Sequence, residues 1–335
     1  MLPKVPKVLV TDSVDLGLLK ELKKYALLEI APNISQEDLI ERVRDADILV
    51  IRGRTQVTGD VIKAAGRLKA IVRAGTGIDN VDLEAALEKG IYVLNAAEAS
   101  ADSVAEFTVG LMIALARRIP FLNESMKKGS WLKDKGLGIE LRGKTLGIVG
   151  LGRIGSRVAR IAKAMGMKVL AYDPYVSRKK ASELEVELVD LETLLRSSDF
   201  ISLHVPLTKE TWRLIGEREI QLMKPSAFLI NTARGGIVDE EALERALKSG
   251  KLAGVALDVF QVEPPSLSKG LLDLDNVILT PHIGGFTREA QGRIAACIAE
   301  DIKRVIRGEE PLNCVRLPTK RWGSFAKKSS PNSVS

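Results

Sequence analysis

Short apolar runs alternate with helical patterns along most of this 335-residue chain. In its first part, apolar runs predict buried strands at 7–11, 27–30, 48–51, 68–72 and 91–94. Between these runs, apolar residues recur at helical spacing in segments that begin near Leu16, Ser35, Thr58 and Asp82. Because strands that alternate with helices at this spacing pair in parallel, this part predicts a doubly wound α/β unit.

The same alternation returns in the second part of the chain. A long helical pattern starts at Ser100 or Asp102 and ends at Arg118, and the pattern then loosens from 120 to 143. Further strands are predicted at 146–149, 169–172, 200–203, 228–230, 254–257 and 277–279. Further helices are predicted before Gly166, from Asp239 onward, and over 287–306. The sequence therefore predicts two successive doubly wound parallel-sheet units.

Gly150, Gly152 and Gly155 form a G-x-G-x-x-G pattern where the strand 146–149 turns into a helix. In this context the glycines permit a tight turn, close approach of a pyrophosphate, and close packing of helix on strand. The helix N-terminus adds amide donors and a partial positive charge. Asp173 ends the next strand, 18 residues after Gly155, where a carboxylate accepts from the ribose hydroxyls and repels a 2′-phosphate. A purely structural glycine turn leaves Asp173 unexplained, so we predict NAD as the cofactor.

Polar residues at the carboxyl ends of the predicted strands indicate a catalytic site, because ligands of open α/β sheets bind there. Arg234 can clamp a carboxylate through its guanidinium. His282 can exchange an alcohol proton, since imidazole titrates near neutral pH. Glu263 would fix the tautomer of His282 if the two side chains pair. The alternatives are that Arg234 forms a structural ion pair, that His282 only makes structural hydrogen bonds, and that Glu263 is a solvated loop acid. We favour a catalytic site, because these residues are predicted to lie together at one edge of the sheet.

Two further residues at strand ends have weaker assignments. His204 lies next to the cofactor crevice, and we favour packing or cofactor contact over catalysis. Asp258 accepts either from the nicotinamide carboxamide or from a backbone amide as a cap, and we favour the carboxamide.

Composition narrows the classes of protein. Two cysteines and two histidines are too few for a disulfide framework or most zinc sites, so we expect no metal and a cytoplasmic location. The sequence has neither a signal-peptide pattern nor an apolar run of about 18 residues. Four of the seven net positive charges lie in the tail 319–335, which we predict to be disordered. The other basic residues are interleaved with acids, so we expect no nucleic-acid or membrane partner.

Six motifs in this sequence resemble those of one enzyme family. They are RAGTGIDNVD (73–82), GLGRIG (150–155), NTARGGIVD (231–239), LDVF (257–260), EPP (263–265) and PHIGG (281–285). In combination they resemble the D-isomer-specific 2-hydroxyacid dehydrogenases, over about residues 5–318. Within that family the resemblance is greatest to the members that act on 3-phosphoglycerate.

This resemblance implies that Arg234, Glu263 and His282 form the catalytic set, with His282 as the acid/base. It implies a Rossmann nucleotide-binding domain, 100–285, inserted into a flavodoxin-like substrate domain made of 1–99 and 286–318. It also implies a homodimer through the nucleotide-binding domain, with a tetramer as the alternative. The expected cofactor contacts are Gly150, Gly152, Arg153, Ile154, Gly155, Asp173, His204, Val205, Pro206, Thr211, Thr232, Ala233, Arg234, Asp258, His282 and Gly284.

For the substrate, the resemblance implies a small phosphorylated hydroxy acid. Arg52, Arg54 and Lys133 match positions that hold phosphate in the phosphoglycerate enzymes, with the lysine typically contributed across the dimer. Arg73 and Gly75 match further substrate positions. The alternative for Arg52 and Arg54 is that they are surface charges.

The resulting expectation is NAD-dependent oxidation of 3-phosphoglycerate to 3-phosphohydroxypyruvate, the entry to serine biosynthesis. A glyoxylate or hydroxypyruvate reductase of the same family is the alternative enzyme, and an NAD(H)-sensing protein similar to transcriptional corepressors is the alternative from another class. Phe286 departs from the small hydroxyl residue usual at its position, which narrows the pocket or repacks the hinge. Since no regulatory domain follows Pro318, feedback inhibition by serine is not expected.

Overall fold

The computed structural model describes residues 5–14, 16–266 and 269–315, which form two compact units. The first, here the five-stranded unit, holds the described residues up to Ala101 and those after Gly285. The second, the seven-stranded unit, holds Asp102–Gly285. The tail 319–335, for which the sequence predicts disorder, lies outside the described residues.

A parallel sheet forms the centre of the five-stranded unit. Its strands are β1 (Lys7–Val10), β2 (Leu27–Ile30), β3 (Ile48–Ile51), β4 (Ala70–Arg73) and β5 (Tyr92–Asn95). They lie in the order β2-β1-β3-β4-β5, with registers such as Val8 opposite Ile48. This is the flavodoxin-like order of a doubly wound sheet, so the fold predicted for this part of the chain is confirmed.

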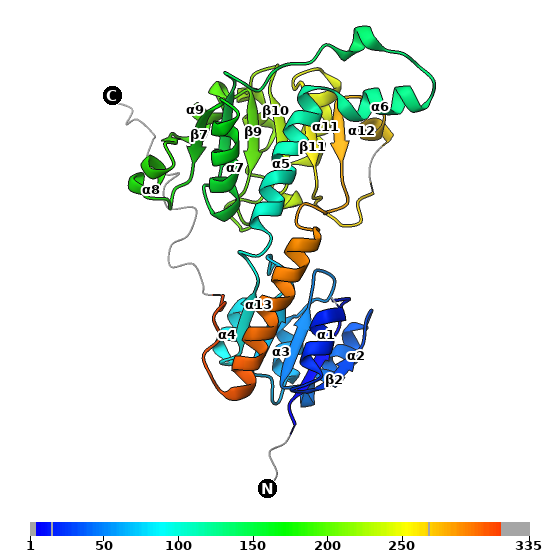
Figure 1. Ribbon diagram of the computed structural model, residues 1–335, viewed down its shortest axis with the longest axis vertical. Helices are drawn as coiled ribbons and strands as arrows, with labels where there is room; N and C mark the ends of the chain where they lie inside the picture. Colours follow the sequence, from blue (N-terminus) through cyan, green and yellow to red (C-terminus); the bar gives the residue numbers. More distant parts are fainter. Residues whose placement is uncertain (1–4, 15, 267–268, 316–335) are drawn as a thin grey trace, which may run out of the picture. The chain divides into compact units, whose positions relative to one another are not determined.

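Helices cover both faces of this sheet. They are α1 (Leu16–Leu22), α2 (Gln36–Arg42), the 3-10 helix η1 (Val43–Asp45), α3 (Gly59–Ala64), α4 (Leu83–Glu88) and α13 (Arg288–Arg307). Val8 and Val10 pack with side chains of α1 and α13, whereas Leu9 packs with those of α2 and α3, because successive strand residues point to opposite faces. Figure 1 shows α13 lying along this sheet. Ser35 and Asp82 cap α2 and α4 by accepting hydrogen bonds from backbone amides.

The seven-stranded unit also has an all-parallel sheet. Its strands are β6 (Thr145–Val149), β7 (Lys168–Tyr172), β8 (Glu187–Leu188), β9 (Phe200–Leu203), β10 (Phe228–Asn231), β11 (Gly254–Leu257) and β12 (Val277–Leu279). They lie in the order β12-β11-β10-β9-β6-β7-β8. Strand order reverses between β6 and β9, as it does at the centre of a Rossmann fold, so this predicted fold is confirmed as well.

Helices enclose the second sheet in the same way. They are α5 (Ala101–Ala116), α6 (Ile119–Lys127), η2 (Lys133–Gly136), α7 (Arg153–Ala164), α8 (Arg178–Glu183), α9 (Leu191–Ser197), α10 (Glu217–Leu222), η3 (Gly235–Ile237), α11 (Glu240–Lys248) and α12 (Lys269–Leu272). Ile148 and Phe200 pack with α5 and α7, which lie in front of the sheet in Figure 1. Val149 and Leu203 pack on the other face with α9, α10 and α11.

Several short elements differ from the sequence expectation. The loosened segment 120–143 contains α6 and η2, and Arg118, with a φ of 53°, separates α6 from α5. Pro120 lies in the first turn of α6, where its missing N–H leaves no helix bond unmade. The sequence also predicts none of β8, α8, α9 or α10, which have at most seven residues each and therefore little periodicity.

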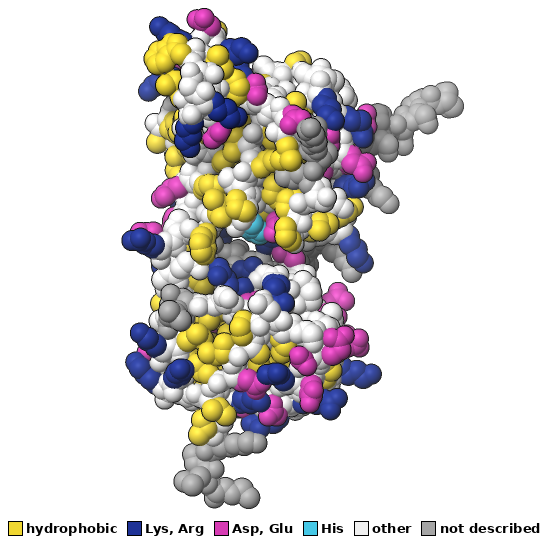
Figure 2. Space-filling view, turned by 90° about the vertical axis from the view of Figure 1, so that its right-hand side faces the viewer, with side chains coloured by type: hydrophobic (Ala, Val, Ile, Leu, Met, Phe, Trp, Pro, Cys, Tyr) yellow, Lys and Arg dark blue, Asp and Glu magenta, His cyan; other side chains and the backbone are white. Residues whose placement is uncertain are grey.

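Within the described ranges, no helix is both long and apolar enough to cross a bilayer. The face in Figure 2 shows basic and acidic side chains, in dark blue and magenta, interspersed over the surface. This pattern agrees with the interleaving of the two charge types along the sequence.

Candidate active site

The loop between β6 and α7 carries the three glycines of the G-x-G-x-x-G pattern. Gly150 has a φ of 98°, and a Cβ there would lie 2.9 Å from the carbonyl group of His204. A Cβ on Gly155 would lie 2.1 Å from the carbonyl oxygen of Gly150, so α7 packs directly onto the loop. At Gly152, no atom in the described part of the chain outside its immediate neighbours lies within 4 Å of an added Cβ. The loop is therefore closed against the sheet at two glycines and open at the third.

Asp173 ties this loop to the end of β7. One carboxylate oxygen, Oδ2, accepts a hydrogen bond from the amide of Leu151 at 2.8 Å. The other, Oδ1, accepts from the amides of Tyr175 and Val176 at 2.9 and 3.2 Å. The carboxylate thus orders the glycine loop and the turn after β7, whatever it also contacts in a bound nucleotide.

His204 follows β9 on the other side of the loop. Its Nε2 pairs with Ser202 Oγ at 2.9 Å, and its Nδ1 is buried with no hydrogen-bond partner among the described residues. Burial lowers the pKa of His204 to about 3, because desolvation disfavours the charged imidazolium. A neutral, half-buried ring of this kind suits packing or cofactor contact better than acid/base catalysis.

The segment after His204 is closed by a turn. Thr211 Oγ1 donates to the carbonyl oxygen of Pro206 at 2.6 Å and accepts from the amide of Thr208 at 2.7 Å. Val205, at the start of this segment, is buried, and its side chain lies where a Cβ on Gly150 would point. The turn therefore stabilises the chain that borders the glycine loop.

Arg234 follows β10 in a tightly held segment. The side chain of Asn231 accepts from the amide of Ala233 at 3.1 Å and donates to the carbonyl oxygen of Arg234 at 2.8 Å. A Cβ on Gly235 would lie 1.8 Å from the carbonyl carbon of Phe260, so only glycine fits there. These contacts fix the backbone from which the Arg234 side chain extends.

Thr232, in the same segment, is linked to the long helix α5. Its Oγ1 lies 2.9 Å from Oγ1 of Thr108, which itself donates to the carbonyl oxygen of Val104 at 2.8 Å. This contact anchors the end of β10 against α5.

The structure brings His282 and Glu263 together. Nδ1 of His282 lies 2.7 Å from Oε2 of Glu263, while Oε1 accepts from the amide of Phe260 at 3.2 Å. Burial raises the pKa of Glu263. The hydrogen bond and the charge of His282 lower the pKa, and so do the amide of Phe260 and the charge of Arg234. Because the lowering effects are larger together, the pKa of Glu263 lies below its usual value. An ionised Glu263 holds a proton on Nδ1 of His282, which leaves Nε2 to exchange a proton with a substrate.

Asp258 holds the segment that presents His282. Its side chain, 1% exposed, accepts from Thr280 Oγ1 at 2.7 Å and from the amides of Ile283 and Gly284 at 2.9 and 2.8 Å. The amide of His282 donates to the carbonyl oxygen of Asp258 at 2.9 Å. The structure shows that Asp258 accepts from backbone amides, and its contact with the nicotinamide carboxamide stays a prediction.

Comparison with known proteins identifies the family of this fold and site. Residues 109–284 match the family model of the D-isomer specific 2-hydroxyacid dehydrogenase, NAD binding domain. The chain belongs to this family. The predicted resemblance and the predicted NAD cofactor are thereby confirmed.

Individual relatives and solved structures carry several names. The chain is 51% identical over 313 residues to D-3-phosphoglycerate dehydrogenase of Methanocaldococcus jannaschii, covering 93% of this chain and 60% of that protein. It is 48% identical over 299 residues to hydroxypyruvate reductase of Thermotoga maritima, covering 88% and 97%. D-lactate dehydrogenase of Aquifex aeolicus, solved with NAD and lactic acid, has a TM-score of 0.85 at 35% identity, covering 93% and 100%. The chain thus spans 60% of the length of the phosphoglycerate dehydrogenase it matches, and nearly all of the other two.

The residues around the glycine loop fit the NAD of this family. An open space at Gly152, the N-terminus of α7 and the buried Nδ1 of His204 all border the switch point of the sheet. A cavity of about 380 Å³ begins at Gly152 and Arg153 and continues between α7 and α8. Its lining includes Arg153, Arg160 and Lys180 together with the acidic Glu183.

Four of the residues expected to contact substrate, namely Arg52, Arg54, Arg73 and Gly75, lie in the five-stranded unit. Arg52 and Arg54 follow β3, and Arg73 ends β4, the next strand in the sheet. The guanidinium of Arg73 lies against Gly75, where a Cβ would be 1.6 Å from Nη1, and near Gly53, where it would be 3.8 Å from Nη2. The structure therefore gathers these arginines at the carboxyl edge of two adjacent strands.

Of the other sequence candidates, Lys133 lies in the seven-stranded unit, and Phe286 begins the second segment of the five-stranded unit. Lys133 is exposed in η2 of the seven-stranded unit, and the Phe286 side chain is 64% exposed. Sequence reasoning also missed Asp12 and Asn80, which bind the loop carrying Arg52 and Arg54. The signals were available, since Asp12 closely follows a strand and Asn80 lies inside the motif 73–82.

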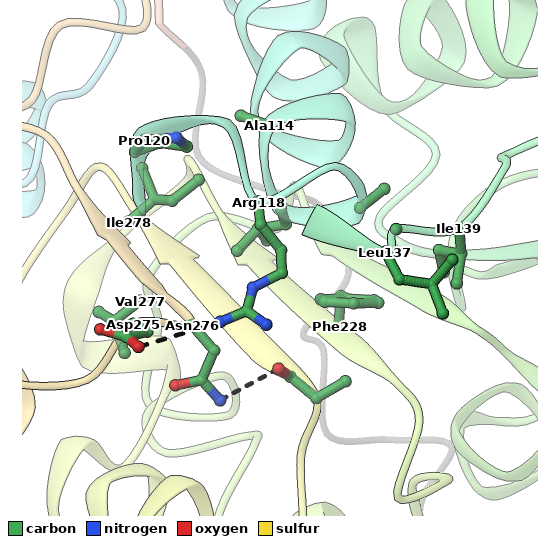
Figure 3. A pocket seen from close by; sticks show the side chains of 14 residues that line it. Ala114, Arg118, Pro120, Leu137, Ile139, Phe228, Asp275, Asn276, Val277 and Ile278 are labelled. Atoms are coloured by element: carbon green, nitrogen blue, oxygen red, sulfur yellow. Dashed lines mark hydrogen bonds and ion pairs between the residues drawn. The ribbon is translucent and has the colours of Figure 1, made fainter. Parts of the chain in front are cut away.

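A further cavity of about 380 Å³ lies away from the candidate site. It opens at the amino ends of β10, β11 and β12, where Phe228, Ala253 and Val277 line it (Figure 3). Arg118 extends into this space toward Asp275, 3.9 Å away, and Leu137 borders its other side. Because the candidate site occupies the carboxyl ends of the same strands, this cavity has no part in the chemistry discussed below.

Proposed function

We propose that this chain is an NAD-dependent dehydrogenase of D-2-hydroxy acids. The observation that carries the proposal is the pairing of His282 with Glu263, 2.7 Å apart, at the carboxyl edge of the NAD-binding sheet. NAD, when bound, supplies the hydride acceptor. Arg234 pairs with the carboxylate of the substrate, and Nε2 of His282 takes the hydroxyl proton as the hydride leaves carbon 2. Glu263 stabilises the imidazolium that forms.

We propose that the two units have different functions. The seven-stranded unit binds NAD and carries the acid/base pair, and the five-stranded unit recognises the rest of the acid. The gathering of Arg52, Arg54 and Arg73 at one sheet edge supports this, since three guanidinium groups suit a doubly charged phosphate better than an uncharged group. The substrate would then be 3-phosphoglycerate and the product 3-phosphohydroxypyruvate, in the entry step of serine biosynthesis.

The relative from Thermotoga maritima favours a second candidate, reduction of hydroxypyruvate, because its name is hydroxypyruvate reductase and 97% of it is covered. A reductase of unphosphorylated acids would not need Arg52, Arg54 and Lys133. Replacing each of these residues with Gln would then leave its activity nearly intact.

Steady-state oxidation of NADH with 3-phosphohydroxypyruvate, hydroxypyruvate and glyoxylate tests the proposal. We expect kcat/KM for the phosphorylated acid to be about a hundredfold higher, which equals roughly 2.7 kcal/mol of differential transition-state binding. Equal values would make Arg52 and Arg54 surface charges and favour the general reductase. Tight NADH binding without turnover of any acid would favour a sensing protein.

We propose a homodimer formed through the seven-stranded unit. The segment 119–139, here called the arm, contains α6 and η2 and carries exposed apolar side chains, namely Ile119, Met126, Trp131 and Leu137, exposed by 49, 52, 75 and 91%. Such a concentration of apolar side chains is typical of a surface that a partner covers. Lys133 lies on the arm, and from the family resemblance we propose that the dimer brings this cation to the partner's site. We further propose a reducing, cytoplasmic location, which the absence of a disulfide between Cys297 and Cys314 in the described part of the chain supports.

A further inference from the structure

The loop of residues 52–55, here the arginine loop, is held from one side by a buried carboxylate. Asp12, which follows β1, is 6% exposed. Its Oδ2 accepts from the amides of Arg52 and Thr55 at 2.6 and 3.3 Å. Its Oδ1 accepts from Thr55 Oγ1 at 3.0 Å and lies 3.4 Å from Nε of Arg54. Both oxygens of Asp12 are therefore engaged by this one loop.

Asn80 holds the same loop from the other side. Its Nδ2 donates to the carbonyl oxygens of Arg52 and Thr55 at 2.9 and 2.6 Å. Its own backbone is fixed in turn, because its carbonyl oxygen accepts from the amide of Val57 at 2.8 Å beside a β-bridge between Val57 and Val81. Both hydrogens of the Asn80 amide group are thus used to fix two carbonyl groups.

The two side chains bind the same two residues of the loop at complementary groups. Asp12 binds the N–H groups of Arg52 and Thr55, and Asn80 binds their C=O groups. The backbone at both ends of the loop is therefore fixed before any ligand arrives. A loop that is already ordered loses less conformational entropy when its side chains bind an anion, and it presents them in a constant geometry.

The arginine side chains also have individual supports. Nη2 of Arg52 donates to Oε1 of Gln291 on α13 at 3.3 Å, and Nη2 of Arg54 donates to the carbonyl oxygen of Thr11 at 3.3 Å. These contacts are longer than the bonds of Asp12 to the amide of Arg52 and of Asn80 to the two carbonyl groups, at 2.6, 2.9 and 2.6 Å, and equal in length to the bond from the amide of Thr55 to Asp12. The backbone beneath both guanidinium groups is thereby held in place.

We propose that Asp12 and Asn80 are positioning residues that fix the arginine loop and thereby set the preference for a phosphorylated acid over its unphosphorylated analogue. The inference deepens the proposed function, because it rests on phosphate recognition by Arg52 and Arg54. Neither residue contacts the reacting atoms. Their effect is expected in KM for the phosphorylated substrate and not in kcat.

Asn80→Ala removes both hydrogen bonds to the loop carbonyls. Asp12→Asn keeps the size of the side chain, but its amide group can accept at only one of the two positions where the carboxylate accepts. For both full-length variants we expect KM for 3-phosphohydroxypyruvate to rise about tenfold, with kcat within about twofold of the wild-type value. We expect kcat/KM for hydroxypyruvate to change by less than about twofold, because that acid has no phosphate for the loop to hold.

Asp301→Asn is the matched control. Asp301 is fully buried in the same five-stranded unit, and it accepts from the amide of Leu312 at 2.6 Å and from Asn313 Nδ2 at 2.8 Å. This variant weakens a loop anchor of the same chemistry on a different loop. We expect it to lower thermal stability while leaving the ratio of kcat/KM between the two acids unchanged.

The outcomes separate this inference from the proposed function. A wild-type protein without preference for the phosphorylated acid overturns the proposed substrate, and the positioning role falls with it. A wild-type preference that Asn80→Ala and Asp12→Asn both retain overturns the positioning role alone. Equal losses with both acids, or a changed ratio in Asp301→Asn, would show general loosening of the unit and would also overturn it. If Asn80→Ala does not fold, the shape-conserving Asp12→Asn decides the question.

Discussion

His282 adopts a φ of 54°, a left-handed conformation that is uncommon for a residue other than glycine. The surrounding segment stabilises it, because the carboxylate of Asp258 accepts three hydrogen bonds from residues 280–284. Backbone strain of this kind persists where neighbouring contacts determine the conformation, and it is frequent at active sites. The strain and its support fit a ring that must meet Glu263 through one nitrogen and a substrate through the other.

Replacement of His282 tests this role directly. We expect His282→Ala to lower kcat by about two to four orders of magnitude, as for loss of a general acid/base. Binding of NADH, followed by its fluorescence, should stay within about threefold of the wild-type value if the effect lies in proton transfer. A kcat within tenfold of wild type would remove His282 from the mechanism.

The lowered pKa of His204 predicts a pH dependence of stability. Its pKa is about 3 in the folded state, against about 6.5 in an unfolded chain, so below pH 6.5 the unfolded state binds a proton that the folded state does not. Stability is therefore lost as pH falls from 6.5 toward 3. Between pH 7 and pH 5 the loss from this residue is about 2 kcal/mol, at 1.36 kcal/mol per pH unit below 6.5.

Urea unfolding at pH 7 and pH 5 measures this effect. His204→Asn carries no titratable ring, so its loss of unfolding free energy between the two pH values should be smaller than that of wild type by about 2 kcal/mol. The absolute stability of the variant does not matter for the comparison. Equal losses in the two proteins would show that His204 is not held neutral.

At the scale of secondary-structure elements, two glycines of the glycine loop are expected to have different roles: Gly155 in the stability of the fold and Gly152 in cofactor binding. A Cβ on Gly155 would lie 2.1 Å from a backbone oxygen, whereas a Cβ on Gly152 would point into open space. We expect Gly155→Ala to lower the unfolding free energy by about 1–3 kcal/mol through overpacking. We expect Gly152→Ala to leave it within about 0.5 kcal/mol and to weaken NADH binding about tenfold or more, because its methyl group occupies cofactor space. Urea unfolding and NADH titration of both variants check this, and indistinguishable behaviour would contradict it.

The strands and the glycine loop could be predicted from sequence because their signals are local. Apolar runs such as 48–51 and 146–149 lie in the structure within one residue of the predicted positions. The helices α8 and α9 were missed, although Ser177 and Asp190 cap them, because six or seven residues show too little apolar periodicity.

The contacts of the acidic residues could not be predicted in the same way. Asp173 and Asp258 each accept three hydrogen bonds, five of the six from backbone amides, and Asp12 accepts from two loop amides. Every residue except proline has an amide, so the sequence does not show which amides a carboxylate will meet. The positions of the acids at strand ends were visible, but their partners depend on how the turns fold.

At the scale of the whole molecule, the exposed apolar residues of the arm lead to a testable prediction about the dimer interface. Leu137, on the arm, is 91% exposed, and Leu27, in β2 of the five-stranded unit, is 62% exposed. Leucine exposure alone does not distinguish these two positions. Both have exposed apolar neighbours, Trp131 at 75% on the arm and Ile30 at 47% on β2, so what distinguishes the arm is its place in the seven-stranded unit, through which we propose the dimer.

A matched pair of variants therefore tests the dimer. We expect wild type and Leu27→Glu to sediment at twice the chain mass, and Leu137→Glu to shift toward the mass of one chain, because a carboxylate buried in an apolar interface is costly. If Lys133 acts across the dimer, Leu137→Glu should also raise KM for the phosphorylated acid, and a higher protein concentration should reverse part of that loss by mass action.

A Leu137→Glu protein that stays dimeric would place the interface elsewhere, and a change in mass for Leu27→Glu would place it on the other unit. A monomeric variant with unchanged KM would keep the dimer but assign phosphate recognition to the arginines of each chain alone.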